Sequence, residues 1–304
     1  MTIPFRQTRS PNSNRGSETL DVAVPATNEQ NMSRPGRLDI CHVSKRYLVA
    51  GRPVPALADI NLSVAPGEFT SIVGASGCGK STLLRLLAGL EPDYDGEIRI
   101  AGSRIAGVSF DRAIVFQERH LIPSLTVEAN VGLGLLGSGL SVAAKRRAVH
   151  DRLELLGLGG FAQAYPGQLS AGMAQRIALA RALVTRPRIL LLDEPLGVFD
   201  VLTRARLQDE LRRIVRHEGM TTVLVTHDVD EAVYLGNRIV VMRPHPGRIV
   251  GIVPVPLAYP RNRSDPAFIR IRDRVLGVLG AEEGVAPIPA ATPAVSLVPQ
   301  RIAS

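Results

Sequence analysis

The sequence predicts an α/β fold with a parallel sheet at its core, and three apolar runs support that prediction. Residues 69–73 (FTSIV) form an apolar run that is followed by a glycine-rich loop and a helical pattern. Residues 189–192 and 222–225 are two further short apolar runs, each flanked by helical patterns. Short buried strands that alternate with helices are typical of a parallel sheet, because its crossover connections are helical.

The pattern along the chain divides it into segments. Residues 1–37 are rich in Pro, Ser and Asn and predict a disordered leader. Strand-like patterns begin at Leu38, with turns expected at 51–53 and 66–67. Between 118 and about 182 no strand pattern occurs, which predicts a helical insert. The remaining segments are a main domain over 38–254, a helical extension over 255–282 and a flexible Ala/Pro-rich tail over 283–304.

Composition excludes several classes of protein. No run of 18 residues is apolar enough to span a bilayer, and the first residues hold no apolar core of a secretory signal. Two cysteines cannot form a disulfide framework, so we expect a cytosolic protein. The net charge of +8 suggests nucleic acid, but no basic cluster is interleaved with aromatic residues, and no nucleic-acid partner is expected. Only 3 of the 36 basic residues are lysines, so each lysine deserves a chemical explanation.

The glycine-rich loop at residues 74–81 (GASGCGKS) matches the pattern G-x-x-x-x-G-K-[ST]. Its glycines let successive backbone N–H groups surround a phosphate, and the following helix adds the partial positive charge of its N-terminus. Lys80 would reach the β- and γ-phosphates, and Ser81 would offer a hydroxyl to Mg²⁺. A glycine turn with an incidental lysine is the alternative, which the preceding strand and following helix disfavour. The residues expected to bind nucleotide here are Gly74, Ala75, Ser76, Gly77, Cys78, Gly79, Lys80, Ser81 and Thr82.

A second site is predicted at residues 189–195 (ILLLDEP), where four apolar residues precede two carboxylates. In a fold with a phosphate loop, Asp193 would hold Mg²⁺ through its waters. Glu194 would accept a proton from the water that attacks the γ-phosphate. An apolar run before Asp-Glu is weak evidence alone and becomes strong beside residues 74–81.

Together these motifs resemble the nucleotide-binding ATPase subunits of ABC transporters, over roughly residues 38–250. Gln117 resembles the glutamine of the family's Q-loop, and His227 its switch histidine. LSAGM, residues 169–173, is similar to the family's signature sequence and is the most family-specific feature. Asp200 matches the D-loop aspartate, and Tyr47 the aromatic residue that stacks on adenine, although Tyr47 could equally be a core residue.

The resemblance implies a RecA-like P-loop NTPase core with a mostly parallel sheet, an antiparallel β subdomain and a helical signature subdomain over about 118–182. It also implies a head-to-tail homodimer in which each ATP lies between one subunit's P-loop and its partner's signature helix. Mg²⁺ would be held by Ser81, Gln117 and Asp193. Water attack would use Glu194 as base and His227 to orient it, while Lys80 stabilises charge. The signature residues that would face the partner's ATP are Ser170, Ala171, Gly172 and Met173.

The family also implies partners and a location. The chain would sit on the cytoplasmic face of the cell membrane as a peripheral protein and drive integral membrane permease subunits. A solute-binding protein would act with it indirectly. The alternative is a soluble ABC-type ATPase acting on nucleic acid or ribosomes, which usually has a coiled-coil insert or two cassettes. A nucleotide kinase or GTPase would lack the signature.

Three positions depart from the family pattern. Ala171 stands where the first signature glycine is usual, and its methyl group is tolerable only if φ is negative. Val198 and Phe199 replace an alanine and a leucine, and would place bulkier side chains where two subunits meet. Cys78 is expected to fill space rather than act as a redox switch, and a bulky thiol reagent there would block nucleotide binding.

Residues 261–279 resemble the C-terminal extension of importer ATPases for nitrate, aliphatic sulfonates and taurine. Ser124 departs from that branch, because a tryptophan usually follows the proline there. The solute and the direction of transport rest on the resemblance alone. The segment predicts a basic amphipathic helix whose apolar side packs on the core. Its basic residues are Arg261, Arg263, Arg270, Arg272 and Arg274, and its packing residues Phe268, Ile271, Val275 and Leu276.

Overall fold

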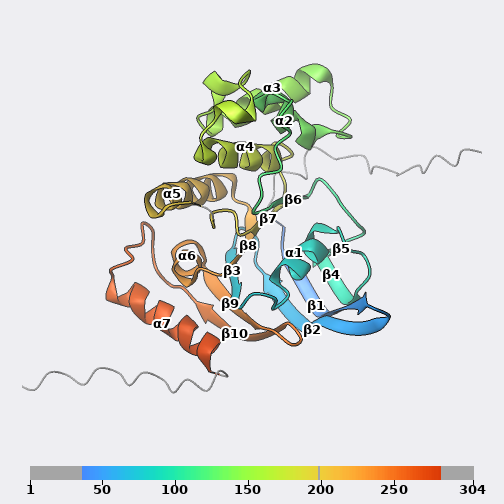
Figure 1. Ribbon diagram of the computed structural model, residues 1–304, viewed down its shortest axis with the longest axis vertical. Helices are drawn as coiled ribbons and strands as arrows, with labels where there is room; N and C mark the ends of the chain where they lie inside the picture. Colours follow the sequence, from blue (N-terminus) through green and yellow to red (C-terminus); the bar gives the residue numbers. More distant parts are fainter. Residues whose placement is uncertain (1–35, 198, 282–304) are drawn as a thin grey trace, which may run out of the picture.

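Two sheets and several groups of helices form residues 36–197 and 199–281, which the computed structural model of the protein describes (Figure 1). The larger sheet has the strand order β10-β9-β3-β8-β7-β6. All its neighbouring pairs are parallel except β10 with β9, so the predicted mostly parallel sheet is confirmed. Its strands are β3 (Phe69–Gly74), β6 (Arg112–Val115), β7 (Ile189–Asp193), β8 (Thr221–Thr226), β9 (Arg238–Arg243) and β10 (Arg248–Pro254).

The smaller sheet is antiparallel, in the order β2-β1-β4-β5. Its first two strands form a hairpin whose turn is Ala50–Gly51, and both residues have positive φ, 49° and 75°. That turn is tighter than the sequence predicts, because Arg52 and Pro53 already belong to β2. The strands are β1 (Leu38–Val49), β2 (Arg52–Val64), β4 (Asp95–Ile100) and β5 (Ser103–Arg104).

Helices cover both faces of the parallel sheet. Helix α1 (Lys80–Ala88) packs between the two sheets, whereas α5 (Val201–Glu218), α6 (Val229–Leu235) and α7 (Pro266–Gly280) lie on the other face (Figure 1). Successive residues of one strand face opposite sides, so Leu191 joins the core with α1 and Leu192 joins the core on the opposite face. A strand buried on both faces reads as a continuous apolar run, which is why residues 189–192 were recognisable in the sequence.

The segment between β6 and β7 forms a separate helical layer at the top of Figure 1. No strand occurs between residues 118 and 182, all of which the structure describes. Buried Asn130 holds the loop that precedes the first helix of this layer, because its amide donates to the carbonyls of Ile122, Leu125 and Thr126 and accepts from the N–H of Ile122. The elements are α2 (Val127–Gly132), η2 (Leu133–Leu135), α3 (Val142–Leu155), η3 (Gly159–Phe161), η4 (Pro166–Gln168) and α4 (Ala171–Leu183).

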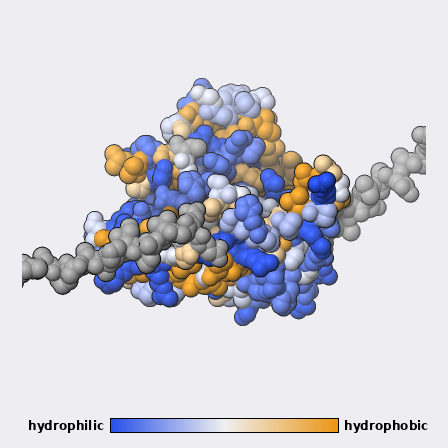
Figure 2. Space-filling model, turned by 60° about the horizontal axis from the view of Figure 1, so that its bottom comes forward, coloured by the Kyte–Doolittle hydropathy of each residue, from blue (hydrophilic) through white to orange (hydrophobic). Residues whose placement is uncertain are grey.

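The C-terminal helix α7 packs on the core as predicted, with two corrections. Phe268 and Val275 are fully buried, but Leu276 is 48% exposed and does not pack. Arg261 is not part of an exposed basic face, because it is buried and bonded to backbone carbonyls. Figure 2 shows apolar surface residues on the face that holds β10 and α7, and Ile252 is among the exposed ones.

Of the predicted leader, residues 1–37, the structure describes only residues 36 and 37, and it describes none of the predicted tail, residues 283–304. Gly36, assigned to the leader by its composition, is buried, and its carbonyl accepts a hydrogen bond from Thr221 Oγ1 at 2.8 Å. Residues 1–35 and 282–304 lie outside the described part. Among the described helices, none is long and apolar enough to cross a membrane.

Candidate nucleotide-binding and hydrolysis site

The predicted site residues gather at the carboxyl edge of the parallel sheet. Val73 is in register with Thr226, Val225 with Asp193, and Leu192 with Val115. The loops that follow these strands therefore begin side by side, as carboxyl ends do in a parallel sheet. Those loops carry the P-loop after β3, Gln117 after β6, Glu194 after β7 and His227 after β8.

The P-loop has the backbone that its glycines predict. Gly77 and Gly79 have φ of 78° and 90°, in the left-handed region that favours glycine. At Gly74 a Cβ atom would overlap the carbonyl oxygen of Met242 and lie 2.6 Å from Cys78 Sγ. Helix α1 begins directly after Gly79, so its unpaired N–H groups and partial positive charge lie at the loop.

Lys80 places its charge inside this loop. Its side chain is buried, and Nζ donates to the carbonyl oxygens of Gly74 at 2.7 Å and Ala75 at 3.0 Å. Both acceptors are neutral groups of the loop itself, and among the residues that the structure describes no carboxylate forms an ion pair with this ammonium. A phosphate oxygen would be a stronger partner than either carbonyl, because a bond between two charged groups is shorter and stronger.

Two of the three predicted Mg²⁺ ligands are in direct contact. Ser81 Oγ donates to Asp193 Oδ1 at 3.2 Å, and burial raises the pKa of Asp193 above its ordinary value. Gln117 is exposed at the end of β6, beside Gly197. One carboxylate with hydroxyl or amide oxygens fits Mg²⁺, which usually takes its other ligands from phosphates and water. The described residues contain no cluster of three His, Cys, Asp or Glu that would hold a metal without nucleotide.

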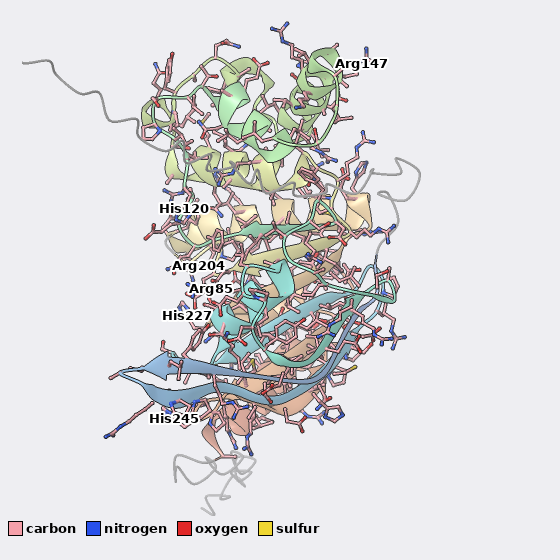
Figure 3. All side chains as sticks on the ribbon, turned by 90° about the vertical axis from the view of Figure 1, so that its right-hand side faces the viewer. Arg85, His120, Arg147, Arg204, His227 and His245 are labelled. Carbon is pink, nitrogen blue, oxygen red and sulfur yellow. The ribbon has the colours of Figure 1, made fainter. Side chains whose placement is uncertain are left out.

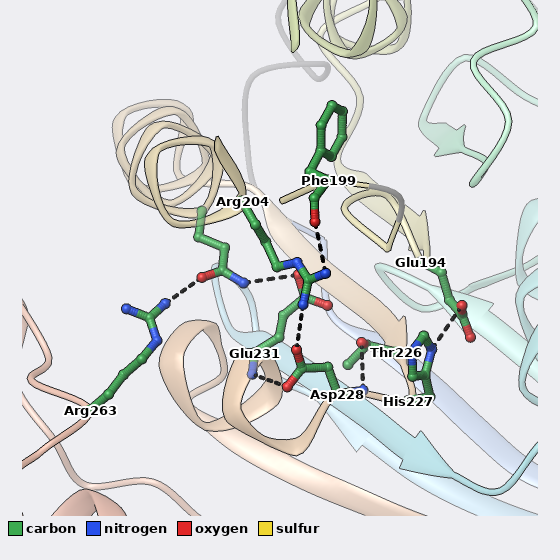
Figure 4. A network of polar contacts seen from close by, with 9 residues as sticks. Glu194, Phe199, Arg204, Thr226, His227, Asp228, Glu231 and Arg263 are labelled. Atoms are coloured by element: carbon green, nitrogen blue, oxygen red, sulfur yellow. Dashed lines mark hydrogen bonds and ion pairs between the residues drawn. The ribbon is translucent and has the colours of Figure 1, made fainter. Parts of the chain in front are cut away.

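Glu194 and His227 form the second direct contact. His227 Nδ1 lies 3.0 Å from Glu194 Oε2 (Figure 4). Glu194 has a φ of 46°, and its N–H donates to the carbonyl of Val225 at 2.9 Å, which fixes its backbone against β8. A non-glycine residue held in the left-handed region is strained, and such strain is common at functional sites. The histidine side chain is 61% exposed and the carboxylate 22%, so the pair faces outward from the sheet.

Tyr47 is half-buried on β1, near the start of α1, rather than in the core. Its hydroxyl donates to Glu91 Oε2 at 2.6 Å, and Lys45 Nζ lies 5.1 Å from the ring centroid. Burial and the bond to Glu91 raise the pKa of Tyr47. The contact with Glu91 could not be predicted from the sequence, because no sequence pattern pairs residues on β1 with the loop after α1.

The signature residues stand apart from the P-loop of their own chain. Ser170 caps α4 by accepting from the N–H of Met173 at 3.3 Å, and Ser170 and Ala171 are exposed. Ala171 is the first residue of a right-handed helix, so its methyl group causes no backbone strain. Within this chain, Gly172 and the P-loop belong to different layers.

Asp200 caps α5, and its Oδ1 accepts from the N–H groups of Leu202 at 3.1 Å and Thr203 at 3.0 Å. Hydrogen bonding from Thr203 lowers the pKa of Asp200. The expectation that Phe199 is presented to another subunit is wrong, because Phe199 is buried with Leu196 and Leu207. Val198 lies outside the described residues.

Cys78 is fully buried under the P-loop, in keeping with the predicted space-filling role. Burial raises the pKa of its thiol, so less of the reactive thiolate is present at neutral pH. Cys41, by contrast, is exposed on β1. The expected block of nucleotide binding by a bulky thiol reagent therefore requires the P-loop to open first.

The fold and the site define a P-loop nucleoside triphosphatase, and comparisons specify its family. The ABC transporter family model matches residues 57–197. The aliphatic sulfonates import ATP-binding protein SsuB of Bacillus subtilis (strain 168) is 47% identical over 232 residues, 76% of this chain and 90% of that protein. An ATP-binding protein of Brucella abortus (strain 2308) is 48% identical over 224 residues, 72% of this chain and 86% of that protein. The chain belongs to the ABC transporter family.

Solved structures agree with this assignment. The dimeric ATP-binding cassette MJ0796, in a post-hydrolysis state with ADP and phosphate, superposes with a TM-score of 0.63 at 32% identity, covering 73% of this chain and all of that one. CbiO1 of Clostridium perfringens, part of an ABC transporter complex, gives 0.64 at 27% identity, covering 71% and 87%. The chain is an ATP-binding and ATP-hydrolysing subunit of an ABC transporter. Neither a nucleic-acid ATPase nor a nucleotide kinase is favoured.

Proposed function

We propose that this chain powers the uptake of a small anion, an aliphatic sulfonate or a related solute such as taurine or nitrate, through a separate membrane permease. The observation that carries the hydrolytic part is the pairing of Ser81 with Asp193 and of Glu194 with His227 at one sheet edge. The solute class is supported by the name and the 47% identity of the Bacillus subtilis relative. The permease partner is supported by the name of the same relative, which describes an import protein.

The proposed chemistry is attack of water on the γ-phosphate of ATP. Glu194 would take the proton of the water, while His227 would hold that carboxylate through Nδ1 and orient the water through Nε2. Lys80 stabilises the charge on the β- and γ-phosphates. Ser81, Asp193 and Gln117 would hold Mg²⁺, which when bound neutralises phosphate charge.

Each chain would supply half of two sites in a homodimer. The exposed N-terminus of α4 presents Ser170 and the N–H of Gly172 outward, as a phosphate-binding helix start requires. The partner's ATP would then join the two chains, and loss of the γ-phosphate would release them. The dimeric cassette with ADP and phosphate supports this arrangement.

The proposed location is the cytoplasmic face of the membrane, against the permease, with a solute-binding protein acting on the other side. The loop that follows Gln117 supports a docking role, because its Ile122 is 42% exposed while Asn130 fixes the backbone beneath it. Ser124 is exposed in the same loop, so the permease that fits here accommodates a small polar residue at that point.

Transport is tested by measuring uptake of radiolabelled ethanesulfonate, taurine and nitrate in host cells that lack the gene. The wild-type gene is expected to restore uptake of at least one anion, and Glu194→Gln is expected not to, because the proposed base is gone. Both proteins are expressed at matched levels. If deletion of the gene leaves the uptake of all three anions unchanged, the proposed solute class is refuted.

The paired-site mechanism is tested by light scattering on Glu194→Gln with and without ATP–Mg²⁺. We expect a monomer without nucleotide and a stable dimer with it, because the bound ATP is no longer hydrolysed. A variant that binds ATP but stays monomeric is then compared with the same variant carrying Ala171→Gly. Recovery of the dimer would show that the alanine hinders closure, and no recovery would contradict self-association of the isolated chain.

A further inference from the structure

We propose that Arg204 is a positioning residue for ATP hydrolysis, because its guanidinium joins the D-loop to the turn that carries His227 (Figure 4). The inference rests on the proposed roles of Glu194 and His227. Arg204 lies one turn inside α5 and belongs to none of the motifs that identified the site. Figure 3 shows it on the same side of the molecule as His227, whereas Arg147 marks the distant end of the helical layer.

One end of this bridge holds the D-loop. Arg204 Nη2 donates to the carbonyl oxygen of Phe199 at 2.9 Å. That carbonyl immediately precedes Asp200, whose side chain is itself tied to the first turn of α5. Because the ring of Phe199 is buried as well, both the backbone and the side chain of this residue are fixed. The position of Asp200 therefore depends on where Arg204 holds the loop.

The other end holds the turn after β8. Arg204 Nη1 donates to Asp228 Oδ2 at 3.1 Å, and the two side chains are 30% and 29% exposed. Asp228 caps α6, since its Oδ1 accepts from the N–H of Glu231 at 3.0 Å, while its own N–H donates to Thr226 Oγ1 at 3.1 Å. His227 lies inside this turn, between the two bonded residues. The bridge thus fixes the backbone from which the histidine reaches the catalytic carboxylate.

A second contact keeps α5 and α6 at a constant spacing behind the bridge. Buried Gln208 donates from Nε2 to Glu231 Oε1 at 3.2 Å, and its Oε1 accepts from Arg263 of the segment before α7. The guanidinium of Arg263 stacks 3.8 Å from the ring centroid of Tyr234. Gln208 therefore ties α5 both to α6, through Glu231, and to the segment before α7, through Arg263. Arg204, one turn earlier on α5, has little freedom to move away from its two acceptors.

An arginine suits this position because its planar fork donates in two directions at once. A lysine could keep the ion pair with Asp228 or the bond to the carbonyl of Phe199, but a single ammonium at the end of a flexible chain would hold the two less firmly together. Arg204 touches neither the nucleotide-binding loop nor the Mg²⁺ ligands. Its loss should therefore slow the chemical step and leave ATP binding intact.

The test measures steady-state ATPase kinetics and ATP binding for wild type, Arg204→Gln and Arg204→Lys. We expect kcat to fall about tenfold in Arg204→Gln and about threefold in Arg204→Lys, with KM for ATP within about twofold of wild type. Arg206→Gln is the matched control, because Arg206 is an exposed arginine on the same helix. Its kcat should equal that of wild type. A melting curve for each protein separates lost folding from lost activity.

A double-mutant cycle tests the pairing itself. Adding Asp228→Asn to Arg204→Gln should lower kcat no further than the larger single change, because both remove the same ion pair. The inference is overturned if kcat per folded molecule is unchanged, or if ATP binding falls in parallel with kcat. A wild-type protein that hydrolyses no ATP would instead overturn the proposed roles of Glu194 and His227, and this inference with them.

Discussion

Two buried cations, Lys80 and Arg261, show how differently the same kind of contact is used in two regions of the molecule. Both side chains are buried, and both donate mainly to backbone carbonyls, although Lys80 Nζ also contacts Cys78 Sγ at 3.8 Å. Lys80 has two such acceptors, which belong to a loop that ends at a helix N-terminus. Arg261 has five, and three of them lie at the C-terminal end of α6, where carbonyl groups lack helical partners.

The difference separates a ligand-binding charge from a structural one. The bonds of Arg261 cap a helix, and its positive charge compensates the negative end of the helix dipole, so each of its three nitrogens has a carbonyl partner and its charge is favourable there. The partners of Lys80 are neutral, and its loop lies at the N-terminus of α1, which is the positive end of that helix dipole. The ammonium adds a second positive charge there, which is unfavourable without an anion. A buried cation therefore indicates an anion site only where its own protein partners leave its charge uncompensated.

The largest effect is expected from Lys80→Arg, which keeps the charge and changes its shape. We expect ATPase kcat/KM to fall by about a thousandfold, equivalent to about 4 kcal/mol, because the larger planar group cannot occupy the narrow loop beside Cys78 and still meet the phosphates. The free energy of unfolding should change much less. Activity is measured with saturating Mg²⁺, and unfolding by urea titration.

Lys145→Arg is the matched control, since Lys145 lies on α3 in the helical layer and is only partly buried. It should retain both activity and stability. If Lys80→Arg kept more than a tenth of the wild-type kcat/KM, the compact ammonium would not be required. Lys80 would then not differ from a structural cation in the chemistry that it supports.

Much of the hydrolytic site was predictable because its functional residues lie in short continuous motifs. The glycines, lysine and serine at residues 74–81 identify a phosphate loop, and the apolar run that ends in Asp193 identifies its expected metal-binding neighbour. Parallel pairing then brings the ends of β3, β7 and β8 together whatever the intervening sequence. It was enough that each motif follows an apolar run, because such runs reveal buried strands in the sequence.

The contacts between distant segments were not predictable in this way. Arg261 belongs by spacing to a basic helix, but it caps α6, 25 to 28 residues earlier in the chain, and only the path of the chain after β10 reveals that. Phe199 was expected at a subunit contact because it precedes Asp200, and nothing in the sequence singled out Arg204. Five strands, β4, β5, β6, β9 and β10, had no counterpart in the sequence analysis, because short or mixed segments give weak periodic signals.

Arg261→Lys is the reciprocal exchange, with a smaller effect of a different kind. An ammonium has three N–H donors, so it cannot satisfy the five carbonyls that Arg261 bonds. We expect a loss of about 3 kcal/mol in the free energy of unfolding, since buried carbonyls at the end of α6 are left without partners. KM for ATP should stay unchanged in the folded protein, and Arg270→Lys, an exposed arginine of α7, should change neither. A loss below about 0.5 kcal/mol would show that Arg261 contributes no more to stability than an ordinary surface arginine.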